Sequence, residues 1–117
     1  MKPKVYVYRG CDTCRKAMKF LEGKKVEFQE VAIREQPPTK AELKRMLEIY
    51  GGDLRKLFNT SGMDYKAMNM KEKLPTLSVE EALKLLSENG NLVKRPFALT
   101  DKAGLVGFKE EDWGKVF

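Results

Sequence analysis

The sequence predicts an α/β domain in which a block of helices is inserted between the first and the last strands. Three observations predict this class. Two strand-like runs near the N-terminus flank a helix, helical periodicity occupies the middle of the chain, and strand-like runs return near the C-terminus. Because 117 residues is the length of one ordinary domain, we expect residues 1–117 to fold as a single unit.

The N-terminal region predicts a strand, a helix and a second strand. Residues 4–8, KVYVY, are β-branched and aromatic and predict a buried strand, which Gly10 ends. Apolar residues at helical spacing predict a helix over residues 12–22, and Gly23 fits its C-cap. Residues 26–31, VEFQEV, predict the second strand. In such a unit the two strands are parallel and the crossover is right-handed.

The middle of the chain predicts helices alone. The pairs Thr39 with Glu42 and Ser78 with Glu81 are capping boxes, and an apolar stripe follows each of them. Two shorter helices are expected between these two, beginning near Asp53 and near Asp64.

The C-terminal region returns to strands. Residues 97–99 and 105–108 predict two strands joined by the hairpin-like connection 100–104, and residues 110–116 predict a last short helix. The expected boundaries are a core of about residues 1–35 and 91–117 and a helical insertion of about residues 38–90.

Composition and charge exclude several classes of function. The net charge of +6 comes from basic residues scattered along the chain, with no basic cluster set among aromatics, so we expect no direct contact with nucleic acid. No apolar run approaches the ~20 residues of a membrane span, and the N-terminus shows no signal-peptide pattern. We therefore expect a cytoplasmic monomer that does not bind membranes and keeps its thiols reduced.

The stretch RGCDTCRKA, residues 9–17, holds both cysteines of the chain. A structural zinc or iron–sulfur site usually takes four ligands, whereas this chain has two cysteines and no histidine. We therefore expect no metal and no bound cofactor. A permanent disulfide is not expected in a reducing compartment either.

The two cysteines differ in position. Cys14 lies on the apolar stripe of the predicted helix, so it is either a buried small hydrophobe or the redox partner of Cys11. Cys11 lies in the strand-to-helix turn, where the free N–H groups and the macrodipole stabilise a thiolate. Residues three apart on a helix are within disulfide reach, and C-x-x-C after a first strand is typical of a redox motif.

A second candidate lies just ahead of the third predicted strand, at Arg95 and Pro96. A thiolate site that handles anions needs a fixed cation, and arginine offers a planar fork of donors that stays charged. The alternative is a surface arginine that precedes a strand-initiating proline.

Taken together, the motifs resemble the arsenate reductase/Spx/YffB family of thioredoxin-fold proteins, and most closely its YffB-like branch. The resemblance covers nearly the whole chain and is carried by five ordered stretches: GCDTCRKA (residues 10–17), PPT (37–39), LFNTSG (57–62), LPTLS (74–78) and NLVKRP (91–96). It implies a thioredoxin-like mixed sheet carrying a helical insertion.

The resemblance also implies roles for individual residues. Cys11 would be the nucleophile, Arg95 would face it across the site, and the bond before Pro96 would be cis. Arsenate reductases of this family place an arginine where this chain has Asn59, and an asparagine brings no charge to an oxyanion. The substrate site implied by the resemblance comprises Asp12, Thr13, Asn59, Thr60 and Pro96.

The resulting functional hypothesis is a thiol–disulfide oxidoreductase in which Cys14 or glutathione resolves the adduct on Cys11. Its expected partners are a small thiol, disulfide or oxyanion substrate and a glutaredoxin, a thioredoxin or a thiol reductant. Two alternatives remain. One is a redox-switched regulator that binds RNA polymerase, like Spx, and the other is a true arsenate reductase.

Overall fold

Four strands form one mixed sheet in the computed structural model, which describes residues 2–117. The strand order is β2-β1-β3-β4. The central strand β1 (Lys4–Val7) pairs parallel to β2 (Gln29–Ala32) and antiparallel to β3 (Phe97–Leu99), which pairs antiparallel to β4 (Gly104–Val106). This mixed α/β architecture confirms the predicted fold class.

The crossover between the two parallel strands ends differently from the prediction. Helix α1 (Asp12–Gly23) continues through Gly23, so the prediction that this glycine is the C-cap is wrong. Lys25 instead takes the left-handed conformation, with φ of +59°, and the Val26 N–H donates to the Leu21 carbonyl oxygen at 3.0 Å. Because the chain must complete this turn before it can pair, β2 begins three residues later than predicted.

Successive side chains of each strand point to opposite faces of the sheet. Val5 and Val7 of β1 lie on one face, together with Ala98 of β3, under α1 and α6 (Glu110–Val116). Trp113 of α6 belongs to this core, and its indole N–H donates to the Gly107 carbonyl oxygen at 3.0 Å. The opposite face is covered by the insertion.

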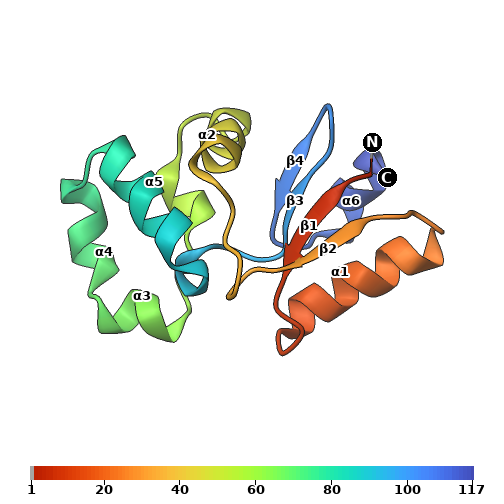
Figure 1. Cartoon of the computed structure of the whole chain (residues 1–117), viewed down its shortest axis with the longest axis horizontal. Helices are drawn as coiled ribbons and strands as arrows, with labels where there is room; N and C mark the ends of the chain where they lie inside the picture. The colour runs from red at the N-terminus through yellow and green to blue at the C-terminus, as the bar shows by residue number, and fades with distance from the viewer. Residues whose placement is uncertain (1) are drawn as a thin grey trace.

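The insertion lies beside the sheet at the end away from both termini (Figure 1). Its two main helices, α2 (Lys40–Ile49) and α5 (Val79–Glu88), begin at the two predicted capping boxes, and both boxes are present. Shorter elements lie between and after them: η1 (Leu54–Leu57), α3 (Met63–Ala67), α4 (Met70–Lys73), η2 (Leu74–Thr76) and η3 (Gly90–Leu92). The last three were not predicted.

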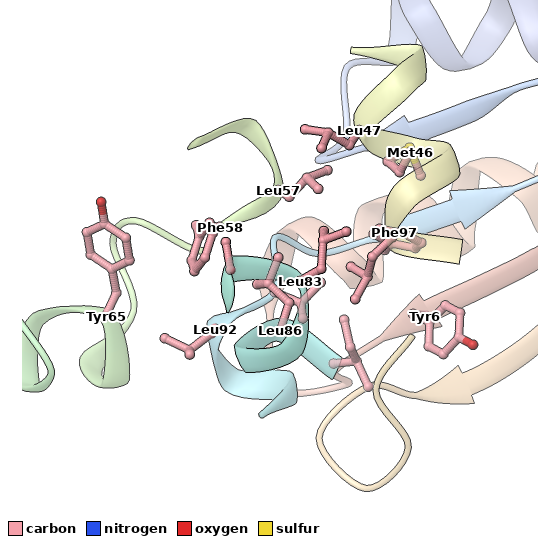
Figure 2. Packing of buried hydrophobic residues seen from close by; sticks show 14 of the residues in the cluster. Tyr6, Met46, Leu47, Leu57, Phe58, Tyr65, Leu83, Leu86, Leu92 and Phe97 are labelled. Atoms are coloured by element: carbon pink, nitrogen blue, oxygen red, sulfur yellow. The ribbon is translucent and has the colours of Figure 1, made fainter. Parts of the chain in front are cut away.

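The larger core joins the insertion to the sheet. Tyr6 and Phe97 meet edge to face at 5.7 Å on this side of the sheet, and residues of the insertion pack against them (Figure 2). The insertion contributes Met46 and Leu47 of α2, Leu57 of η1, Leu83 and Leu86 of α5 and Leu92 of η3. None of the helices between residues 2 and 117 has the length and the apolar character that crossing a bilayer requires.

Candidate active site

Cys11 occupies the N-cap of α1, directly after the loop that leaves β1. Its backbone is extended, with φ of −97° and ψ of 123°, and its N–H donates to the Tyr8 carbonyl oxygen at 3.0 Å. A side chain at an N-cap lies beside the free N–H groups of the first turn. Cys11 is partly exposed and is not part of a disulfide. Its thiol occupies the position where a side-chain oxygen usually caps a helix.

The pKa of Cys11 lies below the ordinary value of a cysteine. Burial acts in the opposite direction, since it disfavours the thiolate. Hydrogen bonds from the backbone and side chain of Cys14 and from those of Thr13 outweigh it and lower the pKa. Cys11 therefore has the electrostatic setting of a reactive thiol.

Cys14 has the opposite setting. It is fully buried in the core beneath α1, and the Tyr8 N–H donates to its Sγ at 3.5 Å. Burial raises the pKa of Cys14 to about 12, and the negative charge of the neighbouring Cys11 adds to this effect. At neutral pH, Cys14 is therefore a protonated thiol that donates to Cys11.

Arg95 is half-buried and follows the segment that leaves the insertion. The bond between Arg95 and Pro96 is cis, as the family resemblance implied. The guanidinium donates to the Gly90 carbonyl oxygen at 2.8 Å and to the Val93 carbonyl oxygen at 3.3 Å. Burial is the main cause that lowers the pKa of Arg95, and the charges of Cys14 and Cys11 act against it.

Pairing between two segments of the insertion brings Asn59 to the same place. The N–H of Asn59 donates to the Leu92 carbonyl oxygen at 2.7 Å, and the N–H of Lys94 donates to the Leu57 carbonyl oxygen at 2.8 Å. The Asn59 amide group itself donates weakly to the Asn91 carbonyl oxygen, at 3.5 Å. This ladder fixes the position of Asn59 relative to Arg95, which lies next along the chain from Lys94.

A pocket of about 560 Å³ unites part of the predicted site. Cys11, Thr13, Asn59 and Arg95 all line it. The other predicted residues lie elsewhere: Cys14 and Pro96 are buried, Asp12 forms an exposed ion pair with Arg15, and Thr60 lines a neighbouring pocket of about 430 Å³.

Sequence reasoning missed several residues that line the pocket with Cys11, and Tyr8 is the clearest case. The ring centroid of Tyr8 lies 5.9 Å from the Arg95 guanidinium and 4.8 Å from that of Arg34. Gly10 leaves room for this ring, because a Cβ there would lie 2.6 Å from it. An aromatic residue at the end of a strand is usually part of the core. Only the position of Tyr8, three residues before Cys11, could have suggested that it lines the pocket. The other missed residues are the polar Ser61, Lys94 and Lys109 and, from the segment around the end of β4, Val106, Gly107 and Phe108.

The hydroxyl of Thr13 offers a direct test of how Cys11 is activated. Thr13→Val keeps the β-branched shape but removes the hydroxyl, so we expect it to raise the pKa of Cys11 and slow alkylation at neutral pH. Thr13→Ser, which keeps the hydroxyl, should titrate like the unaltered protein. Rates of iodoacetamide alkylation between pH 5 and 10 measure this, and superimposed curves for Thr13→Val and the unaltered protein would contradict it.

Across residues 2–117, no three histidine, cysteine, aspartate or glutamate side chains gather as a group that could hold a metal ion. The polar groups that line the pocket include the Cys11 thiol, the Arg95 guanidinium, the Asn59 amide and the amines of Lys94 and Lys109. These groups suit attack on sulfur or on an anion.

Known proteins resemble this chain in sequence and in fold. A crystal structure of an ArsC family related protein from Bacteroides fragilis superimposes with a TM-score of 0.93, at 43% identity, and covers 100% of this chain and 98% of that one. The uncharacterized protein YusI of Bacillus subtilis is 50% identical over 108 residues, 92% of each chain. The global transcriptional regulator Spx of Enterococcus faecalis is 30% identical over 92% of this chain and 80% of its own length. A model of the ArsC family matches residues 6–116, and the chain therefore belongs to the ArsC family.

Proposed function

We propose that this protein is a cytoplasmic thiol–disulfide oxidoreductase whose nucleophile is the Cys11 thiolate. One observation carries the proposal. A thiol of lowered pKa lies at the N-cap of α1 and lines a pocket together with the cation Arg95 and the amide of Asn59. The thiolate is the form of cysteine that attacks a disulfide sulfur, and a helix N-terminus is a site where it persists at neutral pH.

The proposed cycle begins when the Cys11 thiolate attacks one sulfur of a disulfide substrate. A new disulfide bond to Cys11 forms, the substrate's S–S bond breaks, and the departing thiolate takes a proton from water. A thiol reductant such as glutathione then attacks the adduct and releases the second half of the substrate as a thiol. A second reductant molecule regenerates Cys11, so the substrate gains two electrons and the reductant leaves as its disulfide.

The burial of Cys14 supports resolution by an external thiol. Burial is the main cause of the raised pKa of Cys14 and persists when Cys11 carries an adduct, so Cys14 stays largely protonated at pH 7 and its attack on the adduct is slow. Its role in this proposal is to donate a hydrogen bond to Cys11 and to pack in the core. An internal disulfide would form only when no external thiol is available.

The identity of residue 59 separates disulfide reduction from arsenate reduction. We expect negligible arsenate turnover, because the pocket offers an oxyanion the neutral amide of Asn59 beside Arg95. Asn59→Arg should tighten arsenate binding about tenfold, since a hydrogen bond to a charged group contributes about 1.5–3 kcal/mol. Calorimetric titration with arsenate and an assay of arsenite production measure the two effects. Asn59→Gln, an amide without charge, is the matched control, and robust arsenate reduction by the unaltered protein would contradict the proposal.

The alternative function, a redox-switched regulator, is favoured by the likeness to Spx together with the C-x-x-C motif. In this case oxidation of Cys11 and Cys14 would alter the binding of RNA polymerase. Capture of purified RNA polymerase by the oxidised or the reduced protein, combined with the absence of any disulfide turnover, would favour this alternative over the reductase.

A further inference from the structure

The pocket at Cys11 adjoins the second pocket. The two pockets, of about 560 and 430 Å³, share Lys94, Val106, Gly107 and Lys109 among their lining residues. Each is within the range of about 300–1,000 Å³ that is usual for ligand sites. The shared residues form a common wall, across which one ligand can reach from Cys11 into the second pocket.

The two pockets carry an excess of positive charge. Lys94, Arg95 and Lys109 line the first pocket, where no carboxylate is among the lining residues. The second adds Arg55 and Lys56. Within residues 2–117, no ion pair neutralises any of the four cations that line the second pocket.

Two carboxylates line the second pocket and do not balance these cations. One of them, Asp53, already accepts a hydrogen bond from the Arg55 N–H at 3.2 Å, where it caps η1. The other, Asp112, lies in the first turn of α6, where the helix dipole stabilises it. The surplus of cations therefore remains available to an anionic ligand.

We propose that the substrate is an acidic segment of another protein whose cysteine is oxidised to a mixed disulfide, bound with that disulfide at Cys11 and its acidic residues in the second pocket. This inference rests on the proposed function and names its substrate class. The edge of β4 does not offer the segment a strand partner at Val106, because the Val106 N–H already donates to the Tyr50 hydroxyl at 3.0 Å. At this position the cations, rather than the Val106 N–H, are available to bind the segment.

Three peptides that share one central cysteine and differ only in their flanking residues test this. The flanks are glutamate, glutamine or lysine, and each cysteine carries 2-mercaptoethanol as a neutral mixed disulfide. With glutathione as reductant, each turnover consumes two glutathione molecules and yields the peptide thiol, 2-mercaptoethanol and oxidised glutathione. The uncatalysed reaction is subtracted, and kcat/KM is measured for each peptide.

We expect kcat/KM to be about tenfold higher for the glutamate peptide than for the glutamine peptide, and lower still for the lysine peptide. The preference should shrink between 50 and 500 mM salt, because salt screens exposed charges. Arg55→Glu combined with Lys56→Glu should abolish the ratio between the glutamate and the glutamine peptides. Lys84→Glu combined with Lys102→Glu, which reverses two exposed charges that line neither pocket, should leave this ratio unchanged.

Equal rates for the three peptides, or a glutamate preference that survives the Arg55 and Lys56 reversals, would overturn this inference and leave the proposed function intact. A preference lost equally in the Lys84 and Lys102 control would overturn it as well, because net charge alone would then explain it. A mixed disulfide of glutathione with a small thiol serves as a further substrate that has no acidic segment. If neither this compound nor any of the peptides is turned over, the proposed function fails, and the inference fails with it.

Discussion

Cys11→Ser should abolish disulfide turnover, whereas Cys14→Ser should retain turnover that depends on added glutathione. The two cysteines stand one helical turn apart, and their environments push their pKa values in opposite directions. The pKa of Cys11 is lowered by hydrogen bonds from the first turn of α1, whereas burial raises the pKa of Cys14 to about 12. Cys11 is therefore the more readily ionised of the two thiols.

The measurement is competitive alkylation of the two thiols at pH 7, followed by peptide mapping. Cys11 should react at least about 100-fold faster than Cys14, because the thiolate is the reacting form and Cys14 is also fully buried. The alkylation rate of Cys11 should rise with pH and level off below the pH at which an ordinary cysteine does. Equal labelling of both thiols, or an active Cys11→Ser protein, would contradict the assignment.

Cys14→Ser can also change the pKa of Cys11, and the alkylation rate of Cys11 in this variant measures that effect. The Cys14 side chain donates a hydrogen bond that lowers the pKa of Cys11, and a serine hydroxyl can also donate. Cys14→Ala removes the donor, so this variant should react more slowly at neutral pH than Cys14→Ser. A Cys14→Ser protein that loses all turnover while keeping rapid alkylation of Cys11 would show instead that Cys14 is the resolving thiol.

Arg95→Ala should slow the reaction of Cys11 at neutral pH and move its pH profile upward. The Arg95 charge interacts with both thiols, and an opposite charge favours the ionised form. Each unit by which the pKa of Cys11 rises lowers the thiolate fraction at neutral pH about tenfold. The more basic thiolate is, however, also the better nucleophile. The net loss at neutral pH is therefore about three- to fourfold per unit, and above the new pKa the variant should react somewhat faster than the unaltered protein.

Two further variants separate the charge of Arg95 from its geometry. Arg95→Lys retains a cation but not the fork that donates to the carbonyl oxygens of Gly90 and Val93, so it should restore alkylation more fully than turnover of an anionic substrate. Arg34→Ala removes the other guanidinium near Tyr8. Because Arg34 is exposed, its removal should leave the titration of Cys11 unchanged. Superimposed pH–alkylation curves for Arg95→Ala and the unaltered protein, with folding checked by circular dichroism, would remove Arg95 from the site.

The sequence predicted best what local chemistry decides. The capping boxes at Thr39 and Ser78 marked the starts of α2 and α5, because the Ser or Thr and the Glu three residues later satisfy each other's backbone groups without help from the rest of the fold. The start of β2 was predicted less well, since it depends on a turn in which Lys25 takes a conformation usually left to glycine. Helix α4 follows Asn69, which also has positive φ, and its four residues include a single buried one.

The same division holds for the candidate site. Cys11 could be placed at a helix N-terminus from the sequence, because a strand, a turn and a helix adjoin there. The meeting of Asn59 with Arg95 depends on the pairing of Phe58 with Val93, residues 35 positions apart, and only the family resemblance anticipated it. Lys109 lines the pocket from the segment after β4, and no local pattern distinguishes it from the other exposed lysines.

The helices of the insertion cover one face of the sheet and supply much of the larger core, and this limits how such proteins can diverge. Tyr6, Phe97 and Leu99 are shielded from water on the face that the insertion covers, and exposing three large apolar side chains costs about 5–9 kcal/mol. That cost is comparable to the whole stability of a small domain, about 5–15 kcal/mol. The helices over this face therefore cannot be trimmed to suit a new substrate. We expect evolution to retune specificity by single substitutions at the rim of the pockets, at Asn59, Arg55 or Lys109, while the helices over this face are retained.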